Sequence, residues 1–148
     1  MKLFRKRPKA TQLFFTFSTL VATAAINYTI IHSPIILIFV LSIFVHEFGH
    51  YFVSKLKGAD PDYPYFIPLF PLTIGVTRIK NLKDENKSAV AIAGVLFSSI
   101  FLLSILSFNF FFNIFSTFSI LLMLAFELVF NYFGSDGQKY RKYKTSFV

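Results

Sequence analysis

The chain has 148 residues, a formal net charge of +8, 22 Phe, 7 Tyr and no Cys. Apolar residues make up 55% of it and charged residues 15%, against about 45–50% and about 25% in soluble globular domains. This composition excludes an intrinsically disordered chain, the lack of Cys excludes a disulfide scaffold or a thiolate metal site, and the length predicts a single domain over residues 1–148.

Charged residues gather in three segments of the chain. The first is the basic N-terminus, residues 2–9, and the next charged residue after it is Glu47. A mixed segment spans residues 55–87, residues 88–126 carry no charge, and a basic stretch closes the chain from residue 139. A transmembrane helix needs about 20 largely apolar residues, so each long uncharged tract has room for two.

The uncharged tracts predict an all-α polytopic membrane protein. The sequence His32-Ser33-Pro34 divides the first tract, and the segment 109–113 divides the second. We expect four transmembrane helices, at about residues 12–31, 34–54, 88–108 and 112–133. A soluble helical core of unusual aromatic content is the alternative, and it fits the hydropathy pattern less well.

Four spans put both termini and all three charged segments on one side of the membrane. The positive-inside rule assigns that side to the cytoplasm. We therefore expect a multi-pass protein of the inner or plasma membrane, with cytoplasmic basic tails at residues 1–9 and 138–148. Because the basic residues lie next to the membrane, their charge indicates topology and contact with anionic lipid, and it does not indicate binding of nucleic acid.

Three acidic residues lie within or at the edge of the apolar tracts: Glu47, Glu127 and Asp136. A charge at the centre of a bilayer costs about 2.5–3.5 kcal/mol on insertion scales, so each is a candidate functional residue. Glu47 stands between His46 and His50 in an H-E-x-x-H sequence. Two helix-packing histidines with a chance Glu between them are the alternative, but three ionisable groups so close together are costly in a membrane unless they share a purpose.

The H-E-x-x-H spacing predicts a zinc site. Residues four apart on a helix share a face, so His46 and His50 can offer two imidazole nitrogens to one ion. Catalytic zinc has three protein ligands and keeps a fourth position for water, whose pKa it lowers to about 7. Glu47 is close enough to accept a proton from that water. We expect one Zn²⁺ ion as cofactor, with Glu47 as the catalytic base.

A proline-rich segment follows the second predicted helix. It contains Pro61, Pro64, Pro68 and Pro71, surrounded by apolar residues. Proline lacks an N–H donor, so neither a helix nor a central strand is expected, and irregular backbone is tolerated at membrane depth only where protein covers it or it lines a cavity. We expect a re-entrant or membrane-surface hairpin beside the zinc site. A peripheral loop anchored by its aromatic residues is the alternative.

The residues alone leave two candidates for the third zinc ligand. Asp136 follows the fourth predicted helix, where Gly134 and Gly137 permit turns that fold the carboxylate back toward the histidines. Glu127 lies about 13 Å further up a continuous helix, at a depth nearer to that of His50. Helix geometry alone does not decide which of the two carboxylates is the third zinc ligand.

Four segments, within about residues 35–142, resemble the site-2 protease family of intramembrane zinc metalloproteases. The first is an H-E-x-G-H pattern continued by Ser54 and Gly58, at residues 46–58, and the second is the proline-rich segment at residues 63–75. The third is the A-G that opens a third core helix, at residues 91–94, and the fourth is an aspartate-glycine motif at residues 136–137. The resemblance implies that Asp136, ahead of Glu127, is the third zinc ligand.

The resemblance also implies an activity. A member would be a zinc metalloendopeptidase, a hydrolase that cleaves a peptide bond in or near a transmembrane segment of a protein substrate within the lipid bilayer. The chain departs from the family pattern at Val95, which replaces a proline, and in the short stretch without proline between Asn131 and Asp136. These departures motivate the alternative of a degenerate, non-proteolytic membrane protein of the same fold that binds zinc or a partner. The sequence indicates neither the identity of the substrate nor an oligomeric state.

Overall fold

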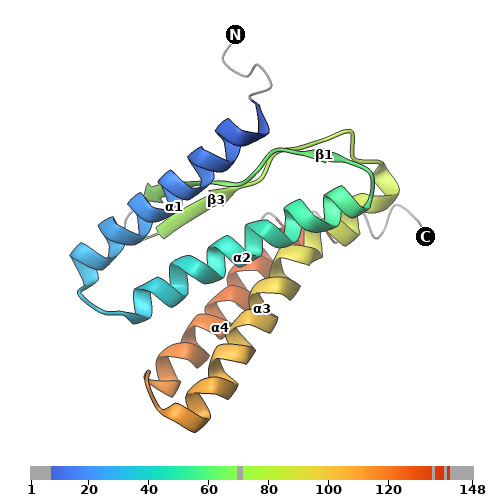
Figure 1. The fold of residues 1–148 in the computed structure, drawn as a ribbon. Coiled ribbons are helices and arrows are strands. Elements are labelled where there is room, and N and C mark those ends of the chain that lie inside the picture. Colours follow the sequence, from blue (N-terminus) through green and yellow to red (C-terminus); the bar gives the residue numbers. More distant parts are fainter. Residues whose placement is uncertain (1–7, 70–71, 135, 139, 141–148) are drawn as a thin grey trace.

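The computed structural model describes residues 8–69, 72–134, 136–138 and 140, so most of the two predicted basic tails lies outside it. Helices dominate the described part, with short antiparallel strands between the second and third long helices (Figure 1). In chain order the elements are α1 (Lys9–Ile31), α2 (Ile35–Leu56), β1 (Asp60–Pro61), β2 (Tyr65–Leu69), β3 (Leu72–Val76), β4 (Ile79–Lys80), the 3-10 helix η1 (Asp84–Asn86), α3 (Lys87–Phe112) and α4 (Thr117–Phe133).

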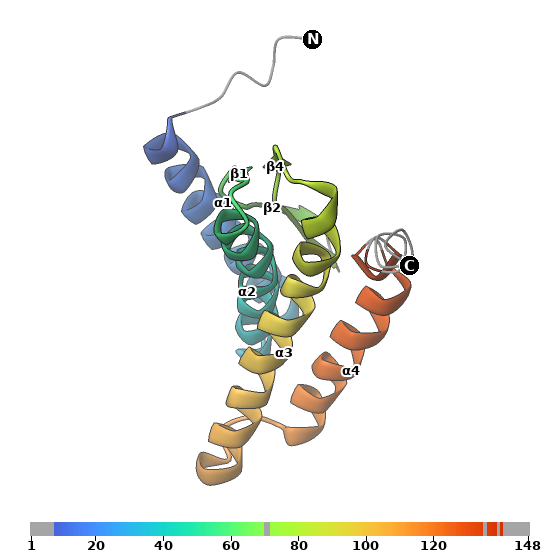
Figure 2. The ribbon, with the colours of Figure 1, turned by 90° about the vertical axis from the view of Figure 1, so that its right-hand side faces the viewer.

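The helices are arranged around the pair α2 and α3, which pack extensively on each other. α1 packs against α2, and α4 packs against α3 (Figures 1 and 2). The hairpin of β2 and β3 lies along α1 and also contacts α2, while β1 pairs with β4 near the end of α2. The α1–α2 and α3–α4 turns lie toward the end of the molecule opposite β1 and β4 (Figure 2).

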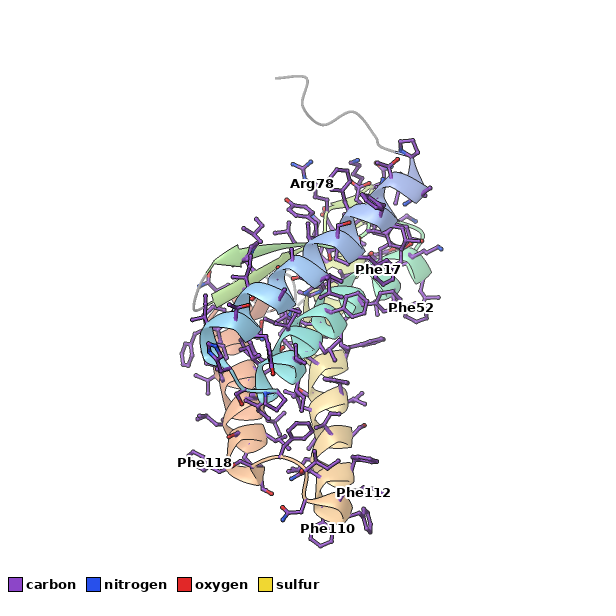
Figure 3. All side chains as sticks on the ribbon, turned by 60° about the vertical axis from the view of Figure 1, so that its left-hand side comes forward. Phe17, Phe52, Arg78, Phe110, Phe112 and Phe118 are labelled. Carbon is purple, nitrogen blue, oxygen red and sulfur yellow. The ribbon has the colours of Figure 1, made fainter. Side chains whose placement is uncertain are left out.

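Many buried residues of the helices are polar, and many large apolar side chains are exposed. The buried residues of α1 are all polar: Gln12, Thr16, Thr23 and Asn27. On the outer surface, aromatic side chains such as Phe110 project from the α3–α4 end, and Arg78 lies at the opposite end (Figure 3). A soluble protein would bury apolar side chains in preference, whereas lipid accepts them on the outside. This distribution supports a membrane-embedded chain.

Within the described part of the chain, three helices are long and apolar enough to cross a membrane, namely α1, α2 and the helical segment formed by η1 and α3. α4 is also apolar but has 17 residues. It is therefore about 25 Å long, less than the hydrocarbon thickness of about 30 Å. The structure agrees with the predicted all-α membrane class. That α4 is a fourth transmembrane helix stays a prediction.

The boundary between the third and fourth helices differs from the prediction. The sequence indicated a break at 109–113, with a fourth helix from residue 112, but α3 continues to Phe112 and α4 begins at Thr117. Asn113 ends α3 in a left-handed conformation with φ 47°, which Asn tolerates better than most residues. Ser116 then caps α4 by accepting a hydrogen bond from a backbone N–H of its first turn.

Asn109 does not break α3 because its side chain bonds the turn that follows. Its amide nitrogen donates to the carbonyl of Phe115 at 3.0 Å, and its amide oxygen accepts from the Phe115 N–H at 2.7 Å. The same nitrogen also donates to the hydroxyl of Thr117 at 3.2 Å. Asn109 is 2% exposed, so these groups are satisfied by one another and not by water. The side chain thus joins α3 to α4.

We expect Asn109→Ala to lower the free energy of unfolding by about 1–3 kcal/mol, because the backbone groups of Phe115 lose their partners. Denaturant unfolding in detergent micelles measures the change. Ser107→Ala is the matched control, because its exposed hydroxyl only donates to a carbonyl of its own helix. Equal stabilities of the two variants would contradict the assigned role of Asn109.

The β2–β3 hairpin is held between α1 and α2. Its strands pair antiparallel from Tyr65 opposite Val76 to Leu69 opposite Leu72. On the α1 side, the hydroxyl of Thr16 donates to the carbonyl of Pro64, and that of Thr19 accepts from the N–H of Phe66 at 3.2 Å. The polar face of α1 therefore satisfies backbone groups beside the outer edge of β2, which lets a proline-rich segment lie within an apolar protein. The predicted depth of the hairpin in the membrane stays a prediction.

Candidate metal centre

Three side chains from distant parts of the chain converge on one point. His46 and His50 lie one turn apart on α2, and Asp136 comes from the residues after α4. The Nε2 atoms of the two histidines are 3.1 Å apart, and they lie 3.1 and 3.0 Å from Oδ2 of Asp136. For tetrahedral zinc with bonds of about 2.0–2.1 Å, ligand atoms are separated by about 3.3 Å. The three atoms therefore have nearly the spacing that zinc requires.

The outer nitrogen of each imidazole is already occupied. Nδ1 of His50 donates to the carbonyl of Val90 at 2.7 Å, because a carbonyl can only accept. Nδ1 of His46 is 2.7 Å from Oε1 of Glu127, which also accepts from the hydroxyl of Ser98. With a proton on both Nδ1 atoms, a neutral imidazole presents a lone pair at Nε2. The convergence of these two nitrogens with a carboxylate oxygen is a donor set that fits a cation.

Asp136 meets both histidines through one oxygen, Oδ2, and its side chain is largely buried. The chain leaves the helical conformation at Gly134 after α4, and residues 136–138 are helical again. This break lets the carboxylate turn back toward α2. Gly134 permits the turn, as the sequence suggested, whereas Gly137 lies within the helical residues 136–138.

Gly94 on α3 leaves open the space beside the two imidazoles. A Cβ atom at this position would lie 2.5 Å from Nε2 of His50 and 2.6 Å from Nε2 of His46. Both distances are too short for any real side chain, and the rings cannot easily withdraw because their Nδ1 atoms are bonded to Glu127 and Val90. The absence of a side chain at Gly94 is thus a condition for a metal to fit between the histidines.

Glu47 lies at the contact between α2 and the β2–β3 hairpin. Its side chain is buried, and its Oε2 accepts a hydrogen bond from the hydroxyl of Thr77 at 2.6 Å. Gly75 of β3 lies so close that a Cβ there would overlap the Glu47 side chain. The residues at the end of the hairpin therefore fix the orientation of the Glu47 carboxylate.

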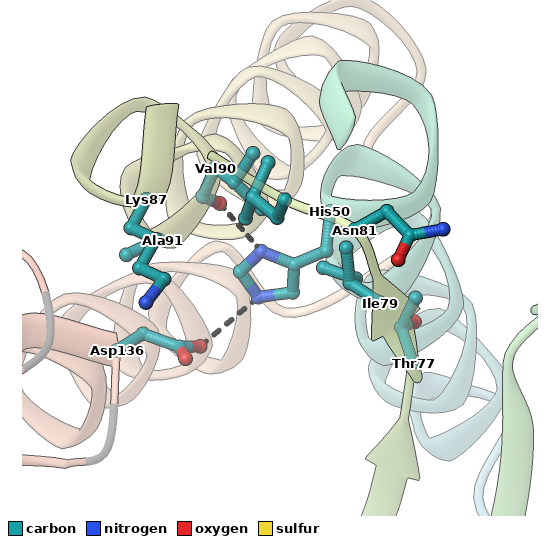
Figure 4. Close-up of a pocket in the computed structure, with 9 residues that line it drawn as sticks. His50, Thr77, Ile79, Asn81, Lys87, Val90, Ala91 and Asp136 are labelled. Carbon is teal, nitrogen blue, oxygen red and sulfur yellow. Dashed lines mark hydrogen bonds and ion pairs between the residues drawn. The ribbon is translucent and has the colours of Figure 1, made fainter. Parts of the chain in front are cut away.

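A pocket of about 350 Å³ opens beside the cluster (Figure 4). Its walls come from α2, the β3–β4 connection, the start of α3 and the segment after α4. It is lined by His50 and Asp136 together with Thr77, Ile79, Asn81, Leu82, Lys87, Val90 and Ala91. Two of the three candidate ligands thus border a space that can admit a water molecule and part of a substrate.

The structure brings together His46, His50 and Asp136, the residues that the sequence pointed to as ligands, in a group that could hold a metal ion. The rival carboxylate, Glu127, lies on the outer side of His46 and contacts Nδ1. The sequence allowed Glu127 to bond a Ser or Asn of a neighbouring helix but did not identify Ser98 as that partner. The signal for Ser98 is a small polar residue inside an apolar helix.

The region that contains the cluster matches a known protein family. A family model described as peptidase M50B-like matches residues 19–136, which include α2, the hairpin, α3, α4 and the three clustered side chains. No curated protein and no solved structure matches the chain. Because the family model covers well over half of the chain, the protein belongs to the peptidase M50B-like family, as a short member of the site-2 protease group.

Proposed function

We propose that the chain is an intramembrane zinc endopeptidase that hydrolyses a peptide bond in or near a transmembrane segment of another protein. His46, His50 and Asp136 hold the ion, and Glu47 is the catalytic base. The observation that carries this proposal is the convergence of two imidazole nitrogens and one carboxylate oxygen beside a pocket. Glu47 follows His46 in the chain and is bonded to Thr77, which lines that pocket. Membership of a peptidase family supports it.

Each group of this chain has a defined task in the proposed reaction. Zinc, when bound, polarises the scissile carbonyl and makes water more acidic. Glu47 accepts the proton of the attacking water and passes it to the leaving amine. Thr77 donates to Glu47 and so keeps the carboxylate in one orientation. The Nδ1 contacts of His46 and His50 keep their Nε2 atoms directed at the ion.

The substrate must be locally extended, because the backbone carbonyls of a helix are already hydrogen-bonded. The hairpin offers a place for such a segment. Its β2 side is occupied by α1, whereas β3 carries Gly75 and leads to Thr77, both next to Glu47. A substrate strand that pairs along β3 would run past the catalytic base, by the strand-addition mode that many peptide-binding proteins use.

The bilayer is the proposed setting of the reaction. α1, α2, α3 and α4 cross the membrane, so the charged segments and both termini lie in the cytoplasm, and the metal centre opens toward that side. The apolar outer surface and the buried polar residues support the location, and the positive-inside rule supports the orientation.

Metal removal and restoration test the proposal. The purified protein in detergent micelles is expected to contain one zinc per chain and to cleave a fluorescently labelled, unfolded reporter protein. A chelator should abolish cleavage, and zinc should restore it. Protein that binds zinc but cleaves neither this reporter nor a reporter with a transmembrane segment would favour the non-proteolytic alternative.

We expect Thr77→Val to slow hydrolysis about 10- to 100-fold with unchanged zinc content, because a hydrogen bond to a charged group contributes about 1.5–3 kcal/mol. The measurement is the turnover number of zinc-loaded protein. Thr73→Val is the matched control in the same hairpin, since its hydroxyl accepts from Asn27 on α1 and has no bond to Glu47. A Thr77→Val variant as fast as this control would remove Thr77 from the mechanism.

A further inference from the structure

Glu127 is a buried carboxylate for which the proposed reaction has no task. It is the only charged residue in α4 and is 7% exposed. Its Oε1 accepts hydrogen bonds from two other helices, one from Nδ1 of His46 on α2 at 2.7 Å and one from the hydroxyl of Ser98 on α3. His46 and Ser98 are 7% and 0% exposed. A single oxygen of α4 thus links three helices inside an apolar protein.

Helix packing alone does not account for this carboxylate. A charged group at membrane depth is costly, and an apolar residue of similar size would fill the same space without that cost. The cost is offset only when the charge meets a partner. The partner here is the ring of His46, whose opposite nitrogen lies in the metal-binding cluster.

We propose that Glu127 is a positioning residue for the metal centre, acting through His46 and not as a ligand. This inference rests on the proposed function. By accepting a hydrogen bond from the Nδ1–H group, Glu127 fixes the tautomer in which Nε2 of His46 has a free lone pair. It also makes Nε2 a stronger electron-pair donor to the ion. Ser98 holds the accepting oxygen in place.

The two histidines are held differently. Nδ1 of His50 donates to the neutral carbonyl of Val90, whereas Nδ1 of His46 meets the carboxylate of Glu127. Only His46 therefore has a carboxylate behind its metal-facing nitrogen, as expected of a positioning residue.

The position of Glu127 also connects α4 to α2. α4 packs mainly on α3. Glu127 reaches α2 through His46, and Asp136, nine residues later in the chain, reaches the same histidine from the other side at 3.1 Å. The C-terminal part of the chain thus holds His46 at both ring nitrogens. Loss of Glu127 should therefore loosen the ion without removing any of its ligands.

Zinc affinity of the full chain in detergent micelles tests the inference, measured by competition with a chromophoric chelator. Glu127→Ala should raise the zinc dissociation constant about 10- to 100-fold, as loss of a partner of a metal-bound histidine typically does. Glu127→Gln should have a smaller effect, because its amide oxygen can still accept from Nδ1. With Co²⁺ in place of zinc, Glu127→Ala should shift the visible absorption bands while their intensity stays typical of a tetrahedral site.

Asn109→Ala is the matched control, because it removes another buried polar side chain of the helix pair about 22 Å along α3 from Gly94. It should change stability and leave zinc affinity and the Co²⁺ spectrum unaltered. Glu127→Gln keeps the native side-chain size, so the comparison stands even where the alanine variant does not fold.

Two results would overturn the inference while the proposed function stands. One is wild-type zinc affinity and an unshifted Co²⁺ spectrum in Glu127→Ala, or in Glu127→Gln where only that variant folds. The other is loss of zinc from Glu127→Ala combined with retention of zinc by Asp136→Ala, which would make Glu127 the ligand. Failure of the unaltered protein to bind zinc at all would overturn the proposed function and this inference with it.

Discussion

Replacing Glu47 with Gln should reduce hydrolysis about 100- to 10,000-fold and leave zinc in place, because general acid–base catalysis typically contributes that much. The amide of Gln cannot take a proton from water, yet it has the same size and can still accept from Thr77. Turnover of the unfolded reporter protein, expressed per bound zinc, measures the loss.

Two further variants serve as controls for this result. Glu85→Gln removes an exposed carboxylate of η1 and should leave turnover unchanged. Asp136→Ala should lose hydrolysis together with zinc, because it removes a candidate ligand. Hydrolysis that survives in zinc-loaded Glu47→Gln would refute the assignment of Glu47 as the base.

Gly94→Ala should abolish zinc binding while the chain still folds. The added methyl group would lie 2.5–2.6 Å from the Nε2 atoms of His50 and His46. The hydrogen bonds of these rings to Val90 and Glu127 keep the rings from moving away from the methyl group. The methyl group and the ion would therefore compete for one space. Zinc per chain measures the loss, and circular dichroism in micelles verifies that the helices persist.

Gly58→Ala is the matched control for this substitution. Gly58 has φ +75° and no atom within 4 Å of an added Cβ. Its replacement should cost about 1 kcal/mol of stability through backbone strain alone and should not affect zinc. If Gly94→Ala bound zinc as tightly as Gly58→Ala, the ion could not lie beside Gly94, and the placement of the metal centre would be wrong.

The sequence predicted the histidine pair well because helical periodicity determines which residues share a face. His46 and His50 are four residues apart in a helix that any hydropathy reading finds, so their convergence needs no tertiary information. The membrane class follows in the same way from two long uncharged tracts. These features depend on local sequence. The structure brings the two imidazoles together, and its long apolar helices are consistent with the membrane class.

The roles of the two late carboxylates could not be predicted from spacing. Glu127 and Asp136 both lie near the level of the histidines, and only the break in the helix at Gly134 directs Asp136 to the Nε2 side of His46. The side of an imidazole ring that a carboxylate meets depends on the rotation of α4 against α3 and α2. That rotation is a property of packing, which single-sequence reasoning does not reach.

The same limitation applies to the hairpin and to the α3–α4 turn. Four prolines predicted extended backbone, but the sequence did not show that the hydroxyls of Thr16 and Thr19 on α1 would bond that backbone. Asn109 suggested a helix break, whereas its amide bonds Phe115 and lets α3 continue. In each case a polar side chain bonds a backbone group that its local propensity does not indicate.

The zinc X-ray absorption spectrum of the purified protein tests the central claim most directly. The account predicts one zinc per chain with two imidazole nitrogens and carboxylate or water oxygen at about 2.0–2.1 Å, and loss of this signature in His46→Ala and in Asp136→Ala. A protein that binds no zinc, or a zinc spectrum without imidazole that these substitutions leave unchanged, would contradict it.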